Sequence, residues 1–113
     1  MLTSANRDAH VRAILLDDDA KDFLDNAEMK SVLAETKSLL KRKLDILGMD
    51  ACLMSMAEIG YQIRESADYA VGSEEIAPLE GWPYDAILAS LVKTPTMTPC
   101  DLSTLIVNKY LES

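Results

Sequence analysis

The chain has 113 residues, of which 49% are hydrophobic and 27% charged, so it is long enough for one compact domain and too short for two ordinary ones. Its net charge of −8 argues against nucleic acid or an anionic membrane as a partner, because like charges repel. A basic ligand is favoured instead.

The N-terminal part holds a short apolar run followed by acidic residues. "VRAILL", Val11–Leu16, is compatible with a buried strand or with a helix fragment. The acidic run "DDDAKD", Asp17–Asp22, lacks the central glycine and closing glutamate of an EF-hand loop, so we expect a solvated turn there and no metal site. The N-terminal "MLTSANRDAH" has no apolar signal core, and no run reaches the roughly 18 residues of a membrane span.

A helix is predicted from Asn26, which offers an N-cap, to the basic residues Lys41–Lys43. Apolar residues recur at helical spacing along it, namely Met29, Val32, Leu33, Leu39 and Leu40. The bounded apolar stretch Leu44–Asp50 then predicts a strand buried on both faces of a parallel sheet.

Two further pairs of elements complete the chain. A helix is expected over Leu53–Glu65, and "DYAVGSEE" predicts another buried strand that ends at Glu74. After the Pro- and Gly-containing loop "PLEGWPYD", helices are expected over Tyr84–Val92 and from Thr98 onward, with Pro99 in the first turn. This order indicates an α/β fold, in which a partly parallel sheet is flanked by helices.

Cys52 follows the first predicted strand within "DILGMDACLMSMAEIG". The carboxyl ends of parallel strands are where α/β sheets bind ligands, and a thiol at a helix N-terminus is favoured as thiolate. A free cysteine is also among the most frequently buried residues, so a structural Cys52 stays open. The only other cysteine, Cys100, is far along the chain, and neither a disulfide framework nor a zinc site is expected.

Several spaced motifs resemble the clostripain family of cysteine peptidases, in the clan of caspases, legumains and gingipains. They are Asp50-Ala51-Cys52-Leu53-Met54, Glu58, Ser73-Glu74-Glu75 and Gly81-Trp82, within a match from about Ala13 to Leu111. The resemblance implies the C-terminal part of a caspase-like α/β/α sandwich. It also implies bacterial origin and a secreted or cell-associated location. Calcium dependence occurs in the family, but no set of calcium ligands can be identified among these residues.

By this resemblance Cys52 is the nucleophile of an endopeptidase that cleaves after Arg or Lys through an acyl-thioenzyme. Asp50 would recognise the basic side chain, Glu80 would be a second acidic residue of the pocket, and Trp82 would shape it. Carboxylates suit this task because two oxygens accept the forked hydrogen bonds of a guanidinium. Asp50 could also cap the helix expected from Leu53, and Trp82 could pin its loop to the core.

The catalytic histidine of the family is followed by glycine, and no His-Gly pair occurs in this chain. The single histidine, His10, is followed by Val11, and we expect it to be a surface residue. We therefore expect residues 1–12 to be poorly ordered or truncated and residues 13–113 to be the C-terminal portion of a peptidase domain, inactive on its own. Its expected partners are basic peptides and either the missing N-terminal part of the domain or a second copy. A non-catalytic domain whose acidic pocket binds basic peptides is the rival hypothesis.

Overall fold

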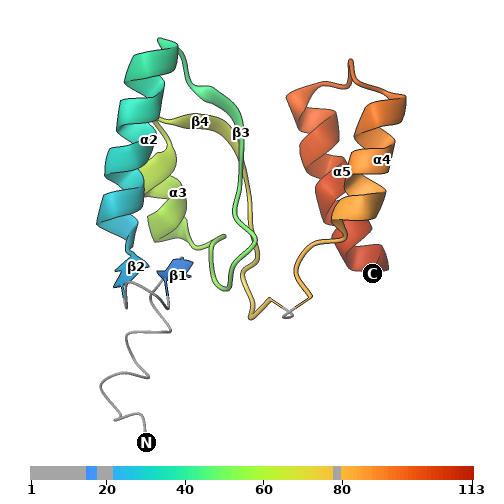
Figure 1. Ribbon diagram of the computed structural model, residues 1–113, viewed down its shortest axis with the longest axis horizontal. Coiled ribbons are helices and arrows are strands. Elements are labelled where there is room, and N and C mark those ends of the chain that lie inside the picture. Colours follow the sequence, from blue (N-terminus) through green and yellow to red (C-terminus); the bar gives the residue numbers. More distant parts are fainter. Residues whose placement is uncertain (1–14, 18–21, 78–79) are drawn as a thin grey trace, which may run out of the picture.

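A parallel pair of strands lies at the centre of the fold, between two layers of helices (Figure 1). The computed structural model describes residues 15–17, 22–77 and 80–113. In chain order the main elements are α2 (Asn26–Leu40), β3 (Leu44–Gly48), α3 (Ala57–Ile63), β4 (Ala67–Val71), α4 (Tyr84–Lys93) and α5 (Pro99–Glu112). The predicted order of helix, strand, helix, strand, helix and helix is confirmed, and with it the α/β class.

Two short strands precede α2. β1 (Leu15–Asp17) pairs antiparallel with β2 (Asp22–Leu24), in a register that places Leu15 opposite Leu24. The end of the first apolar run is therefore a strand. The start of that run and residues 18–21 of the acidic run lie outside the described residues, as do residues 1–12.

The helix α2 starts with a capping box. The carboxylate of Asp25 accepts hydrogen bonds from the N–H groups of Ala27 and Glu28, both at 2.8 Å, and the Glu28 carboxylate accepts the Asp25 N–H at 3.0 Å. The prediction of Asn26 as the N-cap is therefore wrong by one residue. Asp25 takes the role because a Glu stands three positions after it, which satisfies a second backbone N–H.

The helix α3 begins at Ala57, four residues later than predicted, and β4 ends at Val71, not at Glu74. Both differences have one cause. The N–H of Leu53 donates to the carbonyl of Glu75 at 3.2 Å, and the N–H of Ser55 donates to Ser73 at 3.0 Å. Residues 53–55 are thus held in turns against residues 73–75, in an antiparallel sense, and neither segment continues its regular element.

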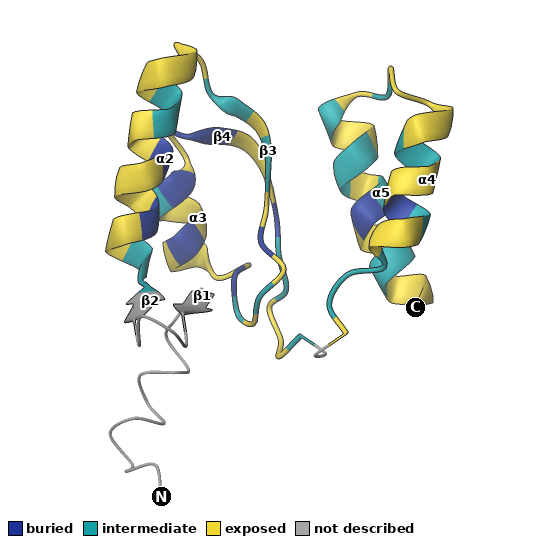
Figure 2. Ribbon diagram, in the orientation of Figure 1, coloured by how far each residue is buried: buried dark blue, intermediate teal, exposed yellow. Residues whose placement is uncertain are grey.

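The two faces of the sheet are covered by separate hydrophobic cores, because consecutive strand residues point to opposite faces. Leu47 of β3 packs against the α2–α3 core, which contains Met29, Leu33, Met49, Met54, Ile59 and Ile63. Ile46 packs against the α4–α5 core, which contains Val71, Ile87 and Ile106. Figure 2 shows the buried stretches of the helices and strands in dark blue.

The strand β3 is less buried than predicted. Ile46 and Leu47 are half-buried, while Asp45 and Gly48 are exposed, so the expectation of a strand buried on both faces is wrong. The expectation that β4 is buried is also wrong, since its residues 68–70 are exposed. Among the described residues the sheet has two strands, and each strand keeps one edge without a partner. No helix within the described ranges is long and apolar enough to cross a bilayer.

Replacing Ile63 by Ala tests the α2–α3 core. Ile63 is 2% exposed, so Ile63→Ala should lower the free energy of unfolding by about 2–4 kcal/mol, through lost burial and the cavity left behind. Leu39 lies on α2 and is 76% exposed, so Leu39→Ala is the control and should change the free energy by less than about 0.5 kcal/mol. Urea denaturation measures both, and equal losses would contradict the placement of the core.

Candidate active site

Cys52 lies in the turns that follow β3, and its thiol is exposed. The structure therefore contradicts the interpretation of Cys52 as a buried core residue. It also contradicts the position at a helix N-terminus, because the nearest helix begins at Ala57 with Met56 as its N-cap. Cys52 is presented by a turn at the carboxyl end of a parallel strand.

Backbone groups hold the sulfur of Cys52 in place. The N–H of Ala77 donates to Sγ at 3.3 Å, and Sγ lies 4.0 Å from the carbonyl oxygen of Ala77. Leu53, the next residue, has φ of 59°, in the left-handed region that a bulky side chain rarely adopts. Such a conformation costs on the order of 1–3 kcal/mol and is found where the surrounding structure imposes it. Here the hydrogen bond from Leu53 N–H to Glu75 provides that constraint.

Asp50 joins the end of β3 to the start of α4. One carboxylate oxygen, Oδ2, accepts the backbone N–H of Trp82 at 2.9 Å and the hydroxyl of Tyr84 at 2.9 Å. Asp50 does not cap α3, because that helix starts seven residues later. Its side chain is exposed and fixes the loop that leads into α4.

The loop approaches Asp50 so closely that glycine is required at position 81. Gly81 has φ of 69°, and a Cβ atom there would lie 2.6 Å from Asp50 Oδ2. Trp82 is half-buried and packs against the α4–α5 core, and a Cβ on Gly48 would meet its indole ring at 3.0 Å. Trp82 thus pins the loop to the core.

Acidic residues surround Cys52 and Asp50 along the chain. Three segments meet here, namely residues 49–56, 72–77 and 80–85, and none of them contains a lysine or arginine. Glu74, Glu75 and Glu80 are exposed, and within the described residues none of them forms a salt bridge. The local charge therefore attracts cations.

Tyr84 is a member of the site that sequence reasoning missed. It is the first residue of α4, and its partner Asp50 stands 34 positions earlier, so no local pattern connects them. Burial and the adjacent Asp50 carboxylate both raise the pKa of Tyr84 above its usual 10.0. The hydroxyl consequently stays protonated and donates to Asp50 at neutral pH.

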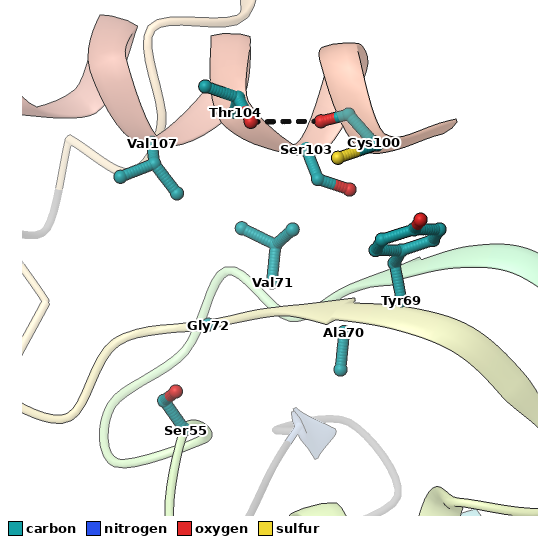
Figure 3. A pocket seen from close by; sticks show the side chains of 9 residues that line it. All are labelled: Ser55, Tyr69, Ala70, Val71, Gly72, Cys100, Ser103, Thr104 and Val107. Carbon is teal, nitrogen blue, oxygen red and sulfur yellow. Dashed lines mark hydrogen bonds between the residues drawn. The ribbon is translucent and has the colours of Figure 1, made fainter. Parts of the chain in front are cut away.

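A cavity of about 360 Å³ lies elsewhere, between β4 and α5 (Figure 3). Tyr69, Val71, Cys100 and Ser103 are among the residues that line it, and neither Cys52 nor Asp50 is. The charge of the Cys100 sulfur is the main cause that raises the pKa of Tyr69. Ser55 and Gly72 also line this cavity, so it borders the segments that carry Cys52 and Glu75 although neither of these two residues lines it.

The structure thus brings together three of the four predicted site residues. The carboxylate of Asp50 accepts a hydrogen bond from the backbone N–H of Trp82, and Cys52 lies two residues after Asp50 in the chain. Glu80 lies two residues before Trp82 and has no hydrogen bond to Asp50 within the described part of the chain. His10 lies outside the described residues.

Comparison with known proteins gives the family. The sequence model of the clostripain family matches residues 2–113. The chain belongs to the clostripain family of cysteine peptidases. The resemblance carried by the Asp50–Met54 motif is therefore confirmed.

A solved structure, "B. fragilis cysteine protease", shares the fold of this clostripain-family chain. The TM-score is 0.65 at 22% sequence identity, over 87% of this chain and 36% of that one. The present chain accordingly spans little more than a third of the length of this neighbour. No curated protein matches the chain.

Gly81→Ala tests the close approach of the loop to Asp50. We expect a loss of about 1–3 kcal/mol in the free energy of unfolding, because alanine is strained at positive φ and its Cβ meets the carboxylate. Gly60→Ala is the matched control, since Gly60 lies in α3 with open space around its Cα, and it should stabilise the chain by about 0.5–1 kcal/mol. If urea unfolding showed that both substitutions change the free energy of unfolding in the same direction, the close approach of the loop to Asp50 would be contradicted.

The raised pKa of Tyr84 predicts a stability loss at high pH. A phenol that holds its proton more tightly in the folded state stabilises that state fully below its unfolded pKa, and the contribution is lost as pH rises through the folded pKa. The midpoint of urea unfolding should therefore fall as pH rises from about 9 to 11.5. Tyr84→Phe should reduce this fall, and a pH profile equal to that of the native protein would refute the Tyr84 contribution.

Proposed function

We propose that this chain carries the nucleophile and the substrate-binding carboxylate of a cysteine endopeptidase that cleaves after Arg or Lys. The observation that supports this most is the exposed thiol of Cys52 in a strained turn at the carboxyl end of β3, in a chain of the clostripain family. Exposure is required because the sulfur must reach a scissile carbonyl carbon.

In the proposed reaction the Cys52 thiolate attacks the carbonyl carbon and forms a tetrahedral oxyanion. Collapse of this intermediate breaks the C–N bond, the amine leaves with a proton from a general acid, and water then hydrolyses the thioester. The backbone N–H of Cys52 donates no hydrogen bond within the described residues, so it is free to stabilise the oxyanion.

Substrate selection would come from the acidic residues of the site. Asp50 is fixed by Trp82 and Tyr84 two residues before Cys52, and the surrounding segments carry carboxylates without a lysine or arginine. A substrate with a basic side chain before the cleaved bond would place its cation against Asp50. Glu80 is a second candidate contact, and Trp82 would form a wall of the pocket.

The reaction also needs a group that accepts and returns protons. The single histidine, His10, has no glycine after it, and it is a weak candidate for this role. We propose that the histidine is supplied by a segment outside these 113 residues, and that residues 13–113 form the nucleophile-bearing portion of the domain. The 36% share of the structural neighbour that the chain covers supports this division.

A second candidate function is a binding domain for basic peptides. The hydrogen bonds that fix Asp50 do not involve Cys52, so the acidic site would persist in a chain whose thiol is inert. Binding of a basic peptide that survives Cys52→Ala, without any covalent labelling of the native chain, would favour this function.

Covalent labelling separates the two functions. An arginine-containing peptide with a thiol-reactive group should label Cys52 in the chain extended by its upstream coding sequence, and label the 113-residue chain weakly or not at all. Mass spectrometry would locate the adduct.

Two variants control the labelling experiment. Cys52→Ala should abolish it, whereas Cys100→Ala should leave it unchanged, although both thiols are exposed. Equal labelling of Cys100 would indicate nonspecific alkylation, and the absence of Cys52 labelling from both forms of the chain would refute the peptidase proposal.

A further inference from the structure

We propose that Tyr84 is a specificity-determining residue, which biases the site toward lysine over arginine by occupying one oxygen of Asp50. The inference rests on the proposed function, because it assumes that Asp50 receives the basic side chain. It goes further in naming which of the two basic residues is preferred and which group decides.

The Asp50 carboxylate can accept only a limited number of hydrogen bonds. Each carboxylate oxygen has two lone pairs, and Oδ2 already accepts two hydrogen bonds at 2.9 Å, from Trp82 N–H and from the Tyr84 hydroxyl. Oδ2 is therefore saturated. Within the described residues no donor reaches Oδ1, so that oxygen is available to a ligand.

Arginine and lysine use a carboxylate differently. A guanidinium binds best through two parallel N–H groups, one to each oxygen, whereas an ammonium acts as a point charge that a single oxygen can accept. With Oδ2 saturated, an arginine loses the second bond of its fork. A lysine loses nothing, since Oδ1 suffices.

The neighbours of Tyr84 favour the position in which its hydroxyl meets Asp50, although the residue is 50% exposed. The ring centroids of Tyr84 and Trp82 are 6.2 Å apart. Tyr84 is the first residue of α4, and it follows the loop in which Trp82 packs against the α4–α5 core. Its raised pKa keeps the hydroxyl as a donor across the physiological range. The second donor, Trp82 N–H, belongs to the backbone and cannot rotate away.

Tyr84→Phe removes the hydroxyl and keeps the ring. One lone pair of Oδ2 is then free, and the arginine fork becomes possible. We expect the ratio of arginine to lysine affinity to rise about five- to tenfold, the value of one charge-assisted hydrogen bond. The phenylalanine ring should still pack near Trp82.

The test is a two-dimensional NMR titration of the full 113-residue chain with two tripeptide amides that are identical except for a C-terminal arginine or lysine. The amide proton of Trp82 donates to Asp50, so its resonance reports directly on ligands at the carboxylate. Native protein, Tyr84→Phe and Tyr61→Phe are compared, and Tyr61 serves as control because it lies on α3, beneath the guanidinium of Arg64.

The outcomes distinguish the inference from the function on which it rests. Tighter lysine than arginine binding in the native chain, with a raised arginine-to-lysine ratio only in Tyr84→Phe, would support the role of Tyr84. Binding of both peptides with the same ratio in all three proteins would overturn it and leave the basic-residue site intact. If neither peptide shifted the Trp82 amide, Asp50 would not be the basic-residue site, and both proposals would fall.

A measurement on the unliganded proteins guards against a folding artefact. The amide resonances of β3 and β4 should keep their dispersion in Tyr84→Phe, since no core residue is changed. If Tyr84→Phe loses that dispersion, Tyr84→Leu becomes the test, because leucine has no hydrogen-bond donor and keeps an apolar side chain at this position. It should raise the ratio in the same direction, and an unchanged ratio would count against the inference.

Discussion

The carboxylate of Asp50 is the interaction on which the arrangement of the site depends. It stands where β3 ends, and its two hydrogen bonds reach the loop and the first helical residue that lead into the outer helix layer. Without these bonds the loop carrying Gly81 and Trp82 would have no polar attachment to the strand within the described residues. The Asp50 carboxylate therefore holds the loop through Oδ2, while Oδ1 stays available. One side chain thus has both a structural role and the proposed role in recognition.

The turn that carries Cys52 depends on a second long-range constraint. The N–H groups of Leu53 and Ser55 donate to the carbonyl oxygens of Glu75 and Ser73, and Leu53 has a positive φ in this turn, which leaves Cys52 exposed. The thiol is consequently placed by the chain that follows β4, and not by the dipole of α3. In this arrangement the turn that carries Cys52 and the acidic segment beside it form one unit, since residues 73–75 supply the carbonyl oxygens that accept the hydrogen bonds of the turn.

Sequence reasoning predicted the parts of the fold that local signals determine. The start of α5 follows from Thr98 and Pro99, and the structure has Thr98 as the N-cap with a capping box to Asp101. The start of α2 was missed by one residue, because Asp25 and Asn26 are both good caps and only the reciprocal bond from Glu28 decides between them. The start of α3 was missed by four, because the competing turn is imposed by residues about 20 positions away. Tyr84 was missed for the same reason. Asp50 and Trp82 were predicted from a family motif, whereas Cys52 was predicted both from that motif and from its position after a predicted parallel strand.

The segment between β4 and α4 has a further consequence, for the divergence of related chains. Neither core contains a side chain from residues 73–77 or from Glu80. Ser73, Glu75 and Ala77 contribute backbone hydrogen bonds to the site, which most amino acids can make equally well. Substitutions there can alter the charge and shape around Asp50 and Cys52 while the two cores keep their packing. Under the proposed function, selectivity can thus change in evolution separately from stability, with Asp50, Gly81 and the turn at Cys52 unchanged.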